Sequence, residues 1–203
     1  MCGRYLISVE EEIIEMREII HEINRRYAGQ PELGQMKSGE IFPTDIVPVI
    51  ALEAEQLRPY LFSWGFPRWQ ESGVIINARS ETAEEKGMFR QALQKRRCII
   101  PASGFYEWRH EGNKKHKDKY IFSRTETPVL YMAGIYTFYK KEGFELPAFV
   151  ILTTAANRSV QPVHNRMPVI IAGDEQEMWL KDEVFARHVL EREGPPLKMI
   201  SCL

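Results

Sequence analysis

The chain has 203 residues, of which 44% are hydrophobic and 27% are charged, and its formal net charge is −1. This composition excludes a disordered chain and a protein coated in basic residues. A chain of this length buries a core without a disulfide framework, and its three cysteines, Cys2, Cys98 and Cys202, are too few to form one. The apolar runs are shorter than the roughly 20 residues of a membrane span, and the first residues lack the pattern of an export signal. We therefore expect a cytoplasmic protein with reduced thiols.

The predicted elements begin with an amphipathic helix that follows Glu10 and ends near Tyr27, because apolar residues recur between them at spacings of three and four. Gly29, Pro31 and Gly34 then mark a loop. Short runs rich in β-branched and aromatic residues predict the strands. These runs are 47–52, 60–64, 74–77, 98–101, 104–109, 120–123, 129–137, 149–154 and 167–171. Further helices are predicted at 88–95 and 175–190.

The order of these elements, with strands dominating the centre of the chain, predicts the α+β class. We expect a single domain over residues 1–203, built on a curved, mostly antiparallel β-sheet or partly open barrel with helices packed outside it. The sequence contains no internal repeat, low-complexity stretch or interdomain linker. Nothing in the pattern therefore favours a second domain.

Charge is distributed unevenly along the chain. Residues 10–22 hold six Glu against one Arg, whereas residues 86–97 hold five bases and no acid. The basic run allows a basic face on the protein, but charge alone favours an ordinary solvated helix.

The candidate chemistry starts at Cys2. Removal of Met1 would leave an amino-terminal cysteine, with an amine and a thiol on adjacent carbons. An α-amine has a pKa of about 7.7 to 8.0, so part of it is a free nucleophile at neutral pH. The amine can form an imine with an aldehyde, and the thiol can then close a thiazolidine ring, which makes covalent capture intramolecular. By position alone, a cysteine at residue 2 is more often incidental.

Three further polar residues lie in apolar, strand-like contexts, where a polar group needs a partner or a task. Asn77 follows an isoleucine pair, Glu107 stands between Tyr106 and Trp108, and His164 follows a Pro-Val pair. A carboxyl among aromatic rings can have a raised pKa, and imidazole is suited to proton transfer near neutral pH. Each residue taken singly is also typical of a structural position.

Other site types fit the sequence less well. The glycines do not have the spacing of a phosphate-binding loop or a dinucleotide fingerprint, so we expect no nucleotide cofactor. The cysteines and histidines lack zinc-ligand spacing, so we expect no metal. A Cys-His peptidase that pairs Cys2 with His164 remains the enzymatic competitor, since those residue types suffice for acyl transfer.

Five motifs taken together resemble the SOS-response-associated peptidase-like (SRAP) domain family, whose members shield abasic sites in single-stranded DNA. The resemblance covers most of the chain, and the motifs stand in the family's order. They are MCGRY at 1–5, INARSET at 76–82, RRCIIPASGFYEW at 96–108, MAGIY at 132–136 and TTAANRSVQPVHNRMPVI at 153–170.

The resemblance implies that mature Cys2 forms a thiazolidine crosslink with the ring-opened aldehyde of an abasic site. The family's asparagine, glutamate and histidine then fall on Asn77, Glu107 and His164. His164 would protonate the sugar ring oxygen, Glu107 would move protons for imine formation and release, and Asn77 would hold the nucleophile or the sugar by hydrogen bonds. Weak strand cleavage by β-elimination, as in an abasic-site lyase, is compatible with the same imine.

The resemblance also implies a set of DNA contacts. Two arginines would bind phosphates, three apolar residues would pack against the flanking bases, and one threonine would add a phosphate contact. These residues are Arg4, Arg79, Pro43, Trp69, Met88 and Thr153. The basic run at 86–97 would guide the strand. The expected partner is single-stranded DNA with an abasic site. We expect a monomer that does not bind membranes and that in a bacterium would associate with the nucleoid, and the sequence does not identify a replication partner.

The chain departs from the family pattern at three places. Residues 64–69 are one residue shorter than usual, which bears on the contact made by Trp69. Glu40, Ile41 and Phe42 stand where relatives commonly have an asparagine and small residues before Pro43. Asn165 replaces the frequent aspartate after the histidine, which removes a charge beside it.

Two hypotheses besides the covalent sensor therefore remain open at the level of sequence. A Cys-dependent peptidase needs a low-pKa thiol but no free amino terminus, whereas the sensor needs the free amine of Cys2. A plain single-strand-binding module needs neither, and would tolerate Cys2→Ala.

Overall fold

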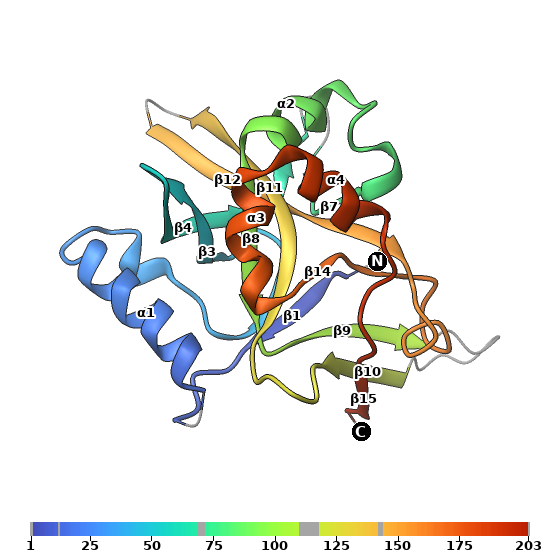
Figure 1. The fold of residues 1–203 in the computed structure, drawn as a ribbon. Coiled ribbons are helices and arrows are strands. Elements are labelled where there is room, and N and C mark those ends of the chain that lie inside the picture. The colour runs from blue at the N-terminus through green and yellow to red at the C-terminus, as the bar shows by residue number, and fades with distance from the viewer. Residues whose placement is uncertain (1, 12, 69–71, 110–117, 142–143, 203) are drawn as a thin grey trace.

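The computed structural model describes residues 2–11, 13–68, 72–109, 118–141 and 144–202. Most of the chain is in β-strands, and short helices lie around the sheets (Figure 1). The helices are α1 (Ile14–Arg26), α2 (Gly87–Lys95), α3 (Gln176–Lys181) and α4 (Glu183–Glu191), with short 3₁₀ turns η1 (Leu33–Gln35), η2 (Ser80–Thr82) and η3 (Gly173–Glu175).

The larger sheet closes into a ring. Its order runs β12–β4–β3–β8–β11, and β11 pairs again with β12; every pairing in the ring is antiparallel except the parallel pairing of β12 with β4. Three short strands extend it, because β7 and β13 pair with β12 and β14 pairs with β11. The members are β3 (Ile46–Glu53), β4 (Gln56–Trp64), β7 (Asn77–Arg79), β8 (Arg97–Ala102), β11 (Leu130–Lys141), β12 (Phe144–Ala155), β13 (Arg166–Pro168) and β14 (Ile170–Ile171).

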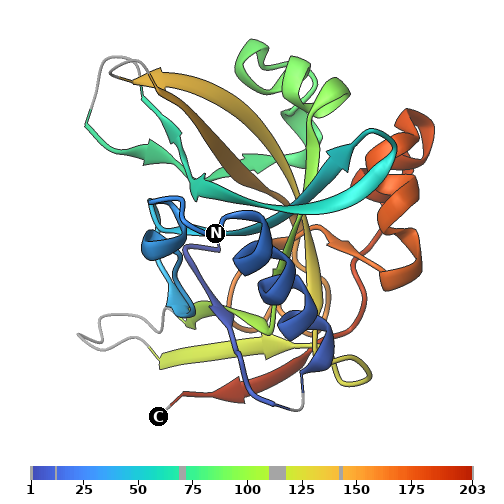
Figure 2. The same ribbon diagram turned by 90° about the vertical axis from the view of Figure 1, so that its left-hand side faces the viewer.

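The second sheet has five antiparallel strands in the order β15–β10–β9–β1–β2 and lies below the ring in Figures 1 and 2. The central strand is β9, which pairs with β1 so that Tyr5 lies opposite Phe105. Its members are β1 (Arg4–Ile7), β2 (Gly39–Ile41), β9 (Gly104–Arg109), β10 (Asp118–Ser123) and β15 (Lys198–Ser201). A further pair, β5 (Phe66–Pro67) with β6 (Val74–Ile75), forms a small hairpin.

One continuous hydrophobic core fills the ring and the space between the two sheets. All six residues of β8 are buried, as expected of a strand covered on both faces. The indole nitrogens of two fully buried tryptophans are satisfied by backbone, because Trp64 Nε1 donates to Ile76 O at 3.1 Å and Trp179 Nε1 donates to Cys98 O at 3.0 Å. Helices α1 and α3 cover the ring at β3, as α2 does at β8 and β11.

The predicted α+β class and curved, mostly antiparallel sheet are confirmed. The prediction of one closing helix over 175–190 is wrong, because the chain breaks at Asp182, whose backbone is extended. The Asp182 side chain accepts a hydrogen bond from Phe185 N at 2.9 Å and so caps a new helix, α4. Among the described residues, no helix is long and apolar enough to cross a membrane.

The basic run at 86–97 is only partly a surface feature. Arg97 is 6% exposed, and its guanidinium donates to Trp179 O at 2.6 Å and to Leu180 O at 3.1 Å. It also donates to the carbonyls of Leu93 and Gln94 at the end of α2. The expectation that this whole run guides DNA is therefore wrong for Arg97, which ties the ends of two helices together.

Candidate active site between the two sheets

Cys2 lies immediately before β1, the strand inserted between β2 and β9. Its side chain is fully buried, and Sγ lies 3.5 Å from the carbonyl oxygen of Arg4. Burial raises the pKa of the Cys2 thiol, and the nearby carboxylate of Glu107 raises it further. The thiol is therefore neutral at physiological pH.

Asn77 is placed against Cys2 by strand β7, which pairs with β12 so that Asn77 lies opposite Ile151. Its Nδ2 donates to the carbonyl oxygen of Cys2 at 3.0 Å. Its Oδ1 is buried and accepts no hydrogen bond from the part of the chain that the structure describes. The Asn77 side chain thus anchors the amino-terminal segment and presents an acceptor within a buried site.

Glu107 lies on β9 and is 3% exposed. The strand alternation places it opposite Tyr120 on one face of the sheet, whereas Tyr106 and Trp108 lie on the other. Its Oε1 lies 4.0 Å from Nδ1 of His164, and its charge acts on the Cys2 thiol. Glu107 therefore lies near the imidazole and close enough to the thiol for its charge to act on it.

His164 ends a turn that connects β12 to β13. Its Nδ1 lies 3.0 Å from Arg166 N, from which the neutral ring can accept a hydrogen bond, and 3.2 Å from Arg166 O, to which a protonated Nδ1 can donate. Burial lowers the pKa of His164. The ring is consequently neutral at pH 7, and when protonated it is a stronger acid than a solvated histidine.

This turn is held in place by two residues that the sequence did not predict. Asn157 is buried, and its Oδ1 accepts from Ser159 N at 3.0 Å while its Nδ2 donates to Pro195 O at 2.7 Å. Arg166 donates through Nη2 to Glu81 Oε2 at 2.9 Å and to Thr153 O at 2.5 Å. Both residues fall inside the long motif at 153–170, which was the only signal for them.

The structure therefore brings together the four predicted chemical residues from four separate parts of the chain. Cys2 and Glu107 belong to the five-stranded sheet, whereas Asn77 and His164 come from strands and turns of the ring. A thiol, an amide, a carboxylate and an imidazole brought together in this way can attack a carbonyl carbon and transfer protons to and from it.

The predicted DNA contacts are distributed around this site with different exposures. Arg79 is exposed on β7, and Arg4 is half-exposed on β1. Pro43 is half-buried after β2, and Met88 is 45% exposed at the start of α2. Thr153 is fully buried, and its Oγ1 donates to Ala78 O at 3.5 Å, so its phosphate contact stays a prediction. Trp69 lies outside the described residues.

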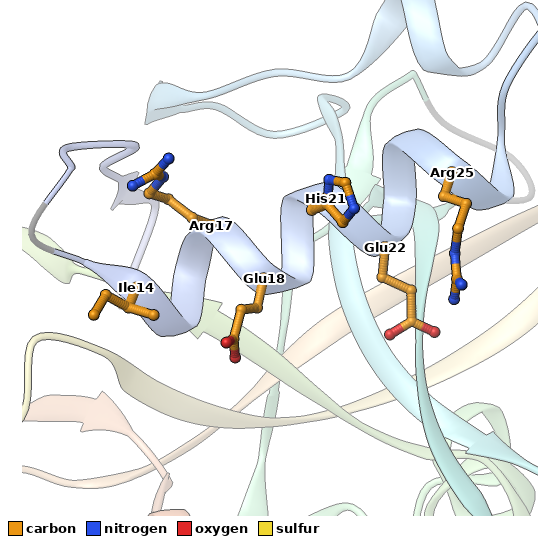
Figure 3. A pocket seen from close by; sticks show the side chains of 6 residues that line it. All are labelled: Ile14, Arg17, Glu18, His21, Glu22 and Arg25. Atoms are coloured by element: carbon orange, nitrogen blue, oxygen red, sulfur yellow. The ribbon is translucent and has the colours of Figure 1, made fainter.

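A hollow along helix α1 lies elsewhere and does not belong to this site. It has a volume of about 490 Å³ and is lined only by residues of α1, which project along the helix in Figure 3. They are Ile14, Arg17, Glu18, His21, Glu22 and Arg25. No predicted site residue lines it. In the described part of the chain, no three His, Cys, Asp or Glu side chains are grouped as metal ligands.

Comparison with known proteins gives the same picture from sequence and from structure. The family model described as "SOS response associated peptidase (SRAP)" matches residues 1–197. An abasic site processing protein of Bacillus subtilis, YoaM, is 33% identical over 187 residues, which cover 89% of this chain and 79% of the relative. The abasic site processing protein YedK of Escherichia coli is 29% identical over 194 residues, covering 94% and 84%.

Solved structures share the fold. A crystal structure of a Bacteroides thetaiotaomicron protein superposes with a TM-score of 0.75 at 27% identity, covering 98% of this chain and 91% of that one. A Bordetella bronchiseptica protein superposes with a TM-score of 0.76 over 100% of both chains, at 22% identity. The chain therefore belongs to the SOS response associated peptidase (SRAP) family.

Proposed function

We propose that this protein processes abasic sites in DNA by forming a covalent crosslink through an amino-terminal Cys2. Curated relatives across most of the chain are named abasic site processing proteins. The observation that supports the covalent chemistry is the convergence of Asn77, Glu107 and His164 on Cys2. In this function the protein senses and shields abasic sites in single-stranded DNA.

The reaction begins with hydrolytic removal of Met1, which converts the amide nitrogen of Cys2 into an amine. That amine attacks the ring-opened aldehyde of the abasic sugar, and loss of one water gives an imine. The thiol then adds to the imine carbon while its proton passes to the nitrogen, which gives a thiazolidine. Amine, thiol and aldehyde together lose one water, and no oxidant or reductant is required.

The surrounding groups have matching tasks. The buried Oδ1 of Asn77 accepts a hydrogen bond from the freed amine, while its Nδ2 keeps the Cys2 carbonyl in place. Glu107 takes up and returns the protons that imine formation and ring closure exchange. His164 in its protonated form donates to the sugar ring oxygen and so favours the open aldehyde. If ring closure is slow, β-elimination from the imine gives weak lyase cleavage.

The substrate is single-stranded DNA, because a duplex would hide both the aldehyde and the bases that flank it. Arg4 and Arg79 contact phosphates on either side of the site, where a guanidinium fork matches phosphate oxygens. Pro43, Met88 and Trp69 supply apolar surfaces for flanking bases, since such stacking tolerates any sequence. Thr153 contributes its phosphate contact only after its hydroxyl leaves Ala78.

The state of the thiol favours this chemistry over a Cys-dependent peptidase. A cysteine peptidase needs an accessible thiolate, usually held by a cationic histidine. Here burial raises the pKa of Cys2 and lowers that of His164, so the favoured state has a neutral thiol and a neutral imidazole. An amine-first reaction does not need the thiolate until ring closure.

The test mixes untagged protein with a single-stranded oligonucleotide that carries one abasic site and resolves the products on a denaturing gel. Cys2→Ala should form no heat-stable adduct, and neither should a protein whose amino terminus is blocked by a non-cleavable extension. Cys202→Ala, which removes an exposed thiol, is the matched control and should react like wild type. An adduct that survives in the blocked protein would contradict the amine-first mechanism.

A further inference from the structure

The outer face of the five-stranded sheet carries a charged cluster of which the proposed function uses only Arg4. Arg4 lies opposite Tyr106, Lys119 lies opposite Trp108, and Glu40 lies opposite Leu6 in the sheet register. Since paired residues share a face and neighbours alternate, this face is the reverse of the one that carries Glu107. We call Arg4, Glu40 and Lys119 the outer triad.

Glu40 holds both cations of the outer triad at once. Its Oε1 accepts from Arg4 Nη1 at 3.0 Å, and its Oε2 accepts from Lys119 Nζ at 2.7 Å. The three side chains are between 25% and 34% exposed, so the cluster is half-buried but reachable from solvent. Burial works to raise the pKa of Glu40, but the hydrogen bonds from Lys119 and Arg4 outweigh it and hold that pKa below its usual value.

Aromatic rings hold the two cations in these positions. The guanidinium of Arg4 lies 3.8 Å from the centre of the Phe42 ring, and Lys119 Nζ lies 4.0 Å from the centre of the Tyr106 ring. Such cation–π contacts orient the charges and restrict water around them. The two cations are therefore held at a distance from each other at which one anion can accept hydrogen bonds from both.

A DNA phosphate is such an anion. Like a carboxylate, it presents two charged oxygens to a pair of donors, and charge-assisted bonds of this kind are the strongest that side chains make. Arg4 is two residues from Cys2 along β1, so a phosphate on Arg4 belongs to a nucleotide near the reacting sugar. With Glu40 in place, however, both cations are already neutralised in part.

We propose that Glu40 occupies the position of a DNA phosphate in the free protein, and that Lys119 becomes a second phosphate contact beside Arg4 when the strand displaces this carboxylate. The inference rests on the proposed function. The exchange weakens binding to intact single strands, since each encounter must first release Glu40.

Glu40→Gln tests this exchange because it removes the charge, keeps the shape, and replaces one of the two accepting oxygens with an NH2 group that cannot accept. Binding of an undamaged, fluorescent single-stranded oligonucleotide should become about tenfold tighter, as expected for releasing a charge-assisted pair. The slope of log Kd against log salt should steepen by roughly 0.7, because binding then neutralises one more net charge than in wild type, where the phosphate only replaces the carboxylate of Glu40. Glu53→Gln is the matched control. Glu53 accepts a hydrogen bond from Arg26 at 2.7 Å in a surface ion pair away from the five-stranded sheet. The affinity of the Glu53→Gln variant for the oligonucleotide should stay at the wild-type value.

Lys119→Gln tests the second contact. In the Glu40→Gln background it should return the affinity and the salt slope to near the wild-type values, whereas in wild type its effect should be smaller. An unchanged or weaker affinity in Glu40→Gln, with wild-type melting temperature, would overturn the exchange. If the Glu40→Gln variant and the Glu40→Gln/Lys119→Gln double variant bind the oligonucleotide with equal affinity, Lys119 is not a second phosphate contact.

Crosslinking of each variant to an oligonucleotide with one abasic site, measured in parallel, separates this inference from the proposed function. Wild-type crosslinking without any effect of Glu40→Gln on binding overturns the phosphate exchange alone. Tighter binding by Glu40→Gln without crosslinking in any variant overturns the covalent function and leaves the exchange standing.

Discussion

At the scale of single residues, His164 decides the pH dependence of the proposed reaction. Its pKa is lowered by burial, whereas the freed α-amine of Cys2 has an ordinary pKa of about 7.7 to 8.0. The reaction needs the histidine protonated and the amine neutral. The rate of crosslinking should therefore rise with pH below the pKa of His164, stay level between the two values, and fall above that of the amine.

His164→Gln should remove the alkaline limb of this profile and slow crosslinking by about 100-fold near neutral pH, the usual contribution of a general acid. In the variant the rate should rise with pH and then level off as the amine loses its proton. Time courses from pH 5.5 to 9 measure both effects, and His188→Gln, at an exposed position on α4, is the control. A variant that keeps the wild-type profile would show that His164 is not the acid.

The apolar context of Asn77, Glu107 and His164 did not single them out, and the prediction of these residues together with Cys2 came from the resemblance of five motifs to the family. The sequence was not sufficient for Asn157 or Arg166. Asn157 acts through backbone atoms of residues 194 and 195, and Arg166 acts through Glu81, so neither role is visible within a local window. The outer triad is hidden for the same reason, since Glu40 and Lys119 are 79 residues apart.

At the scale of elements, the close approach of β8, β11 and β12 depends on Gly134. A Cβ at this position would lie 3.0 Å from Val150 O and 3.1 Å from Cys98 Sγ, and it would overlap Ile100 Cδ1. Gly134→Ala should therefore destabilise the protein by about 1 to 3 kcal/mol through overpacking. Denaturant unfolding measures the change.

Gly87→Ala is the matched control for this prediction. Gly87 begins α2, and no atom lies within 4 Å of the position that its Cβ would take. Alanine loses less chain entropy than glycine on folding, so the variant should be neutral or more stable by a few tenths to about 1 kcal/mol. Equal effects at both glycines would contradict the packing described for the ring.

Elements with a strong period were predictable, and those set by a single contact were not. Periodicity located α1 and α2 because their apolar residues recur on one face. It merged α3 and α4, because the cap that separates them consists of one side chain, Asp182, bonded to one backbone nitrogen. Strands β1, β2 and β15 also went unpredicted, since three- or four-residue strands carry too few residues to show an alternation.

At the scale of the whole molecule, paired carboxylates set the response to acid. The hydrogen bonds from Arg166 to Glu81 and from Arg192 to Glu175 hold the pKa of each carboxyl below its ordinary value of 4.5. A lowered folded-state pKa contributes stability that is present above the unfolded value and is lost as pH falls through the folded value. His164 acts in the same direction below its ordinary pKa, because the unfolded chain takes up its proton more readily.

The melting temperature should therefore be nearly constant between about pH 7 and 8, fall slightly below about 6.5, and fall steeply below about 4.5. Glu175→Gln should lower it at neutral pH and flatten the acid limb, since the variant has lost that carboxylate before acid is added. Glu177→Gln, which breaks an exposed pair with Lys181, should leave the curve near wild type. Identical curves for both variants would mean that the Glu175 pair adds no stability.

The arrangement of the two sheets explains why the four chemical residues need the complete fold. The ring supplies Asn77 and His164, the five-stranded sheet supplies Cys2 and Glu107, and the shared core fixes one against the other. Composition and strand count predicted the fold class. They did not predict that β12 closes the ring with β4, because a parallel pairing between distant strands leaves no local pattern.

The central claim is that both the amine and the thiol of Cys2 become bonded to one sugar carbon. Intact mass spectrometry of the adduct should give the mass of the chain without Met1, plus the oligonucleotide, minus one water. After denaturation and alkylation with iodoacetamide, Cys98 and Cys202 should be modified and Cys2 should not, because its sulfur lies in the thiazolidine ring. An adduct with an alkylated Cys2 or with Met1 retained would contradict the account.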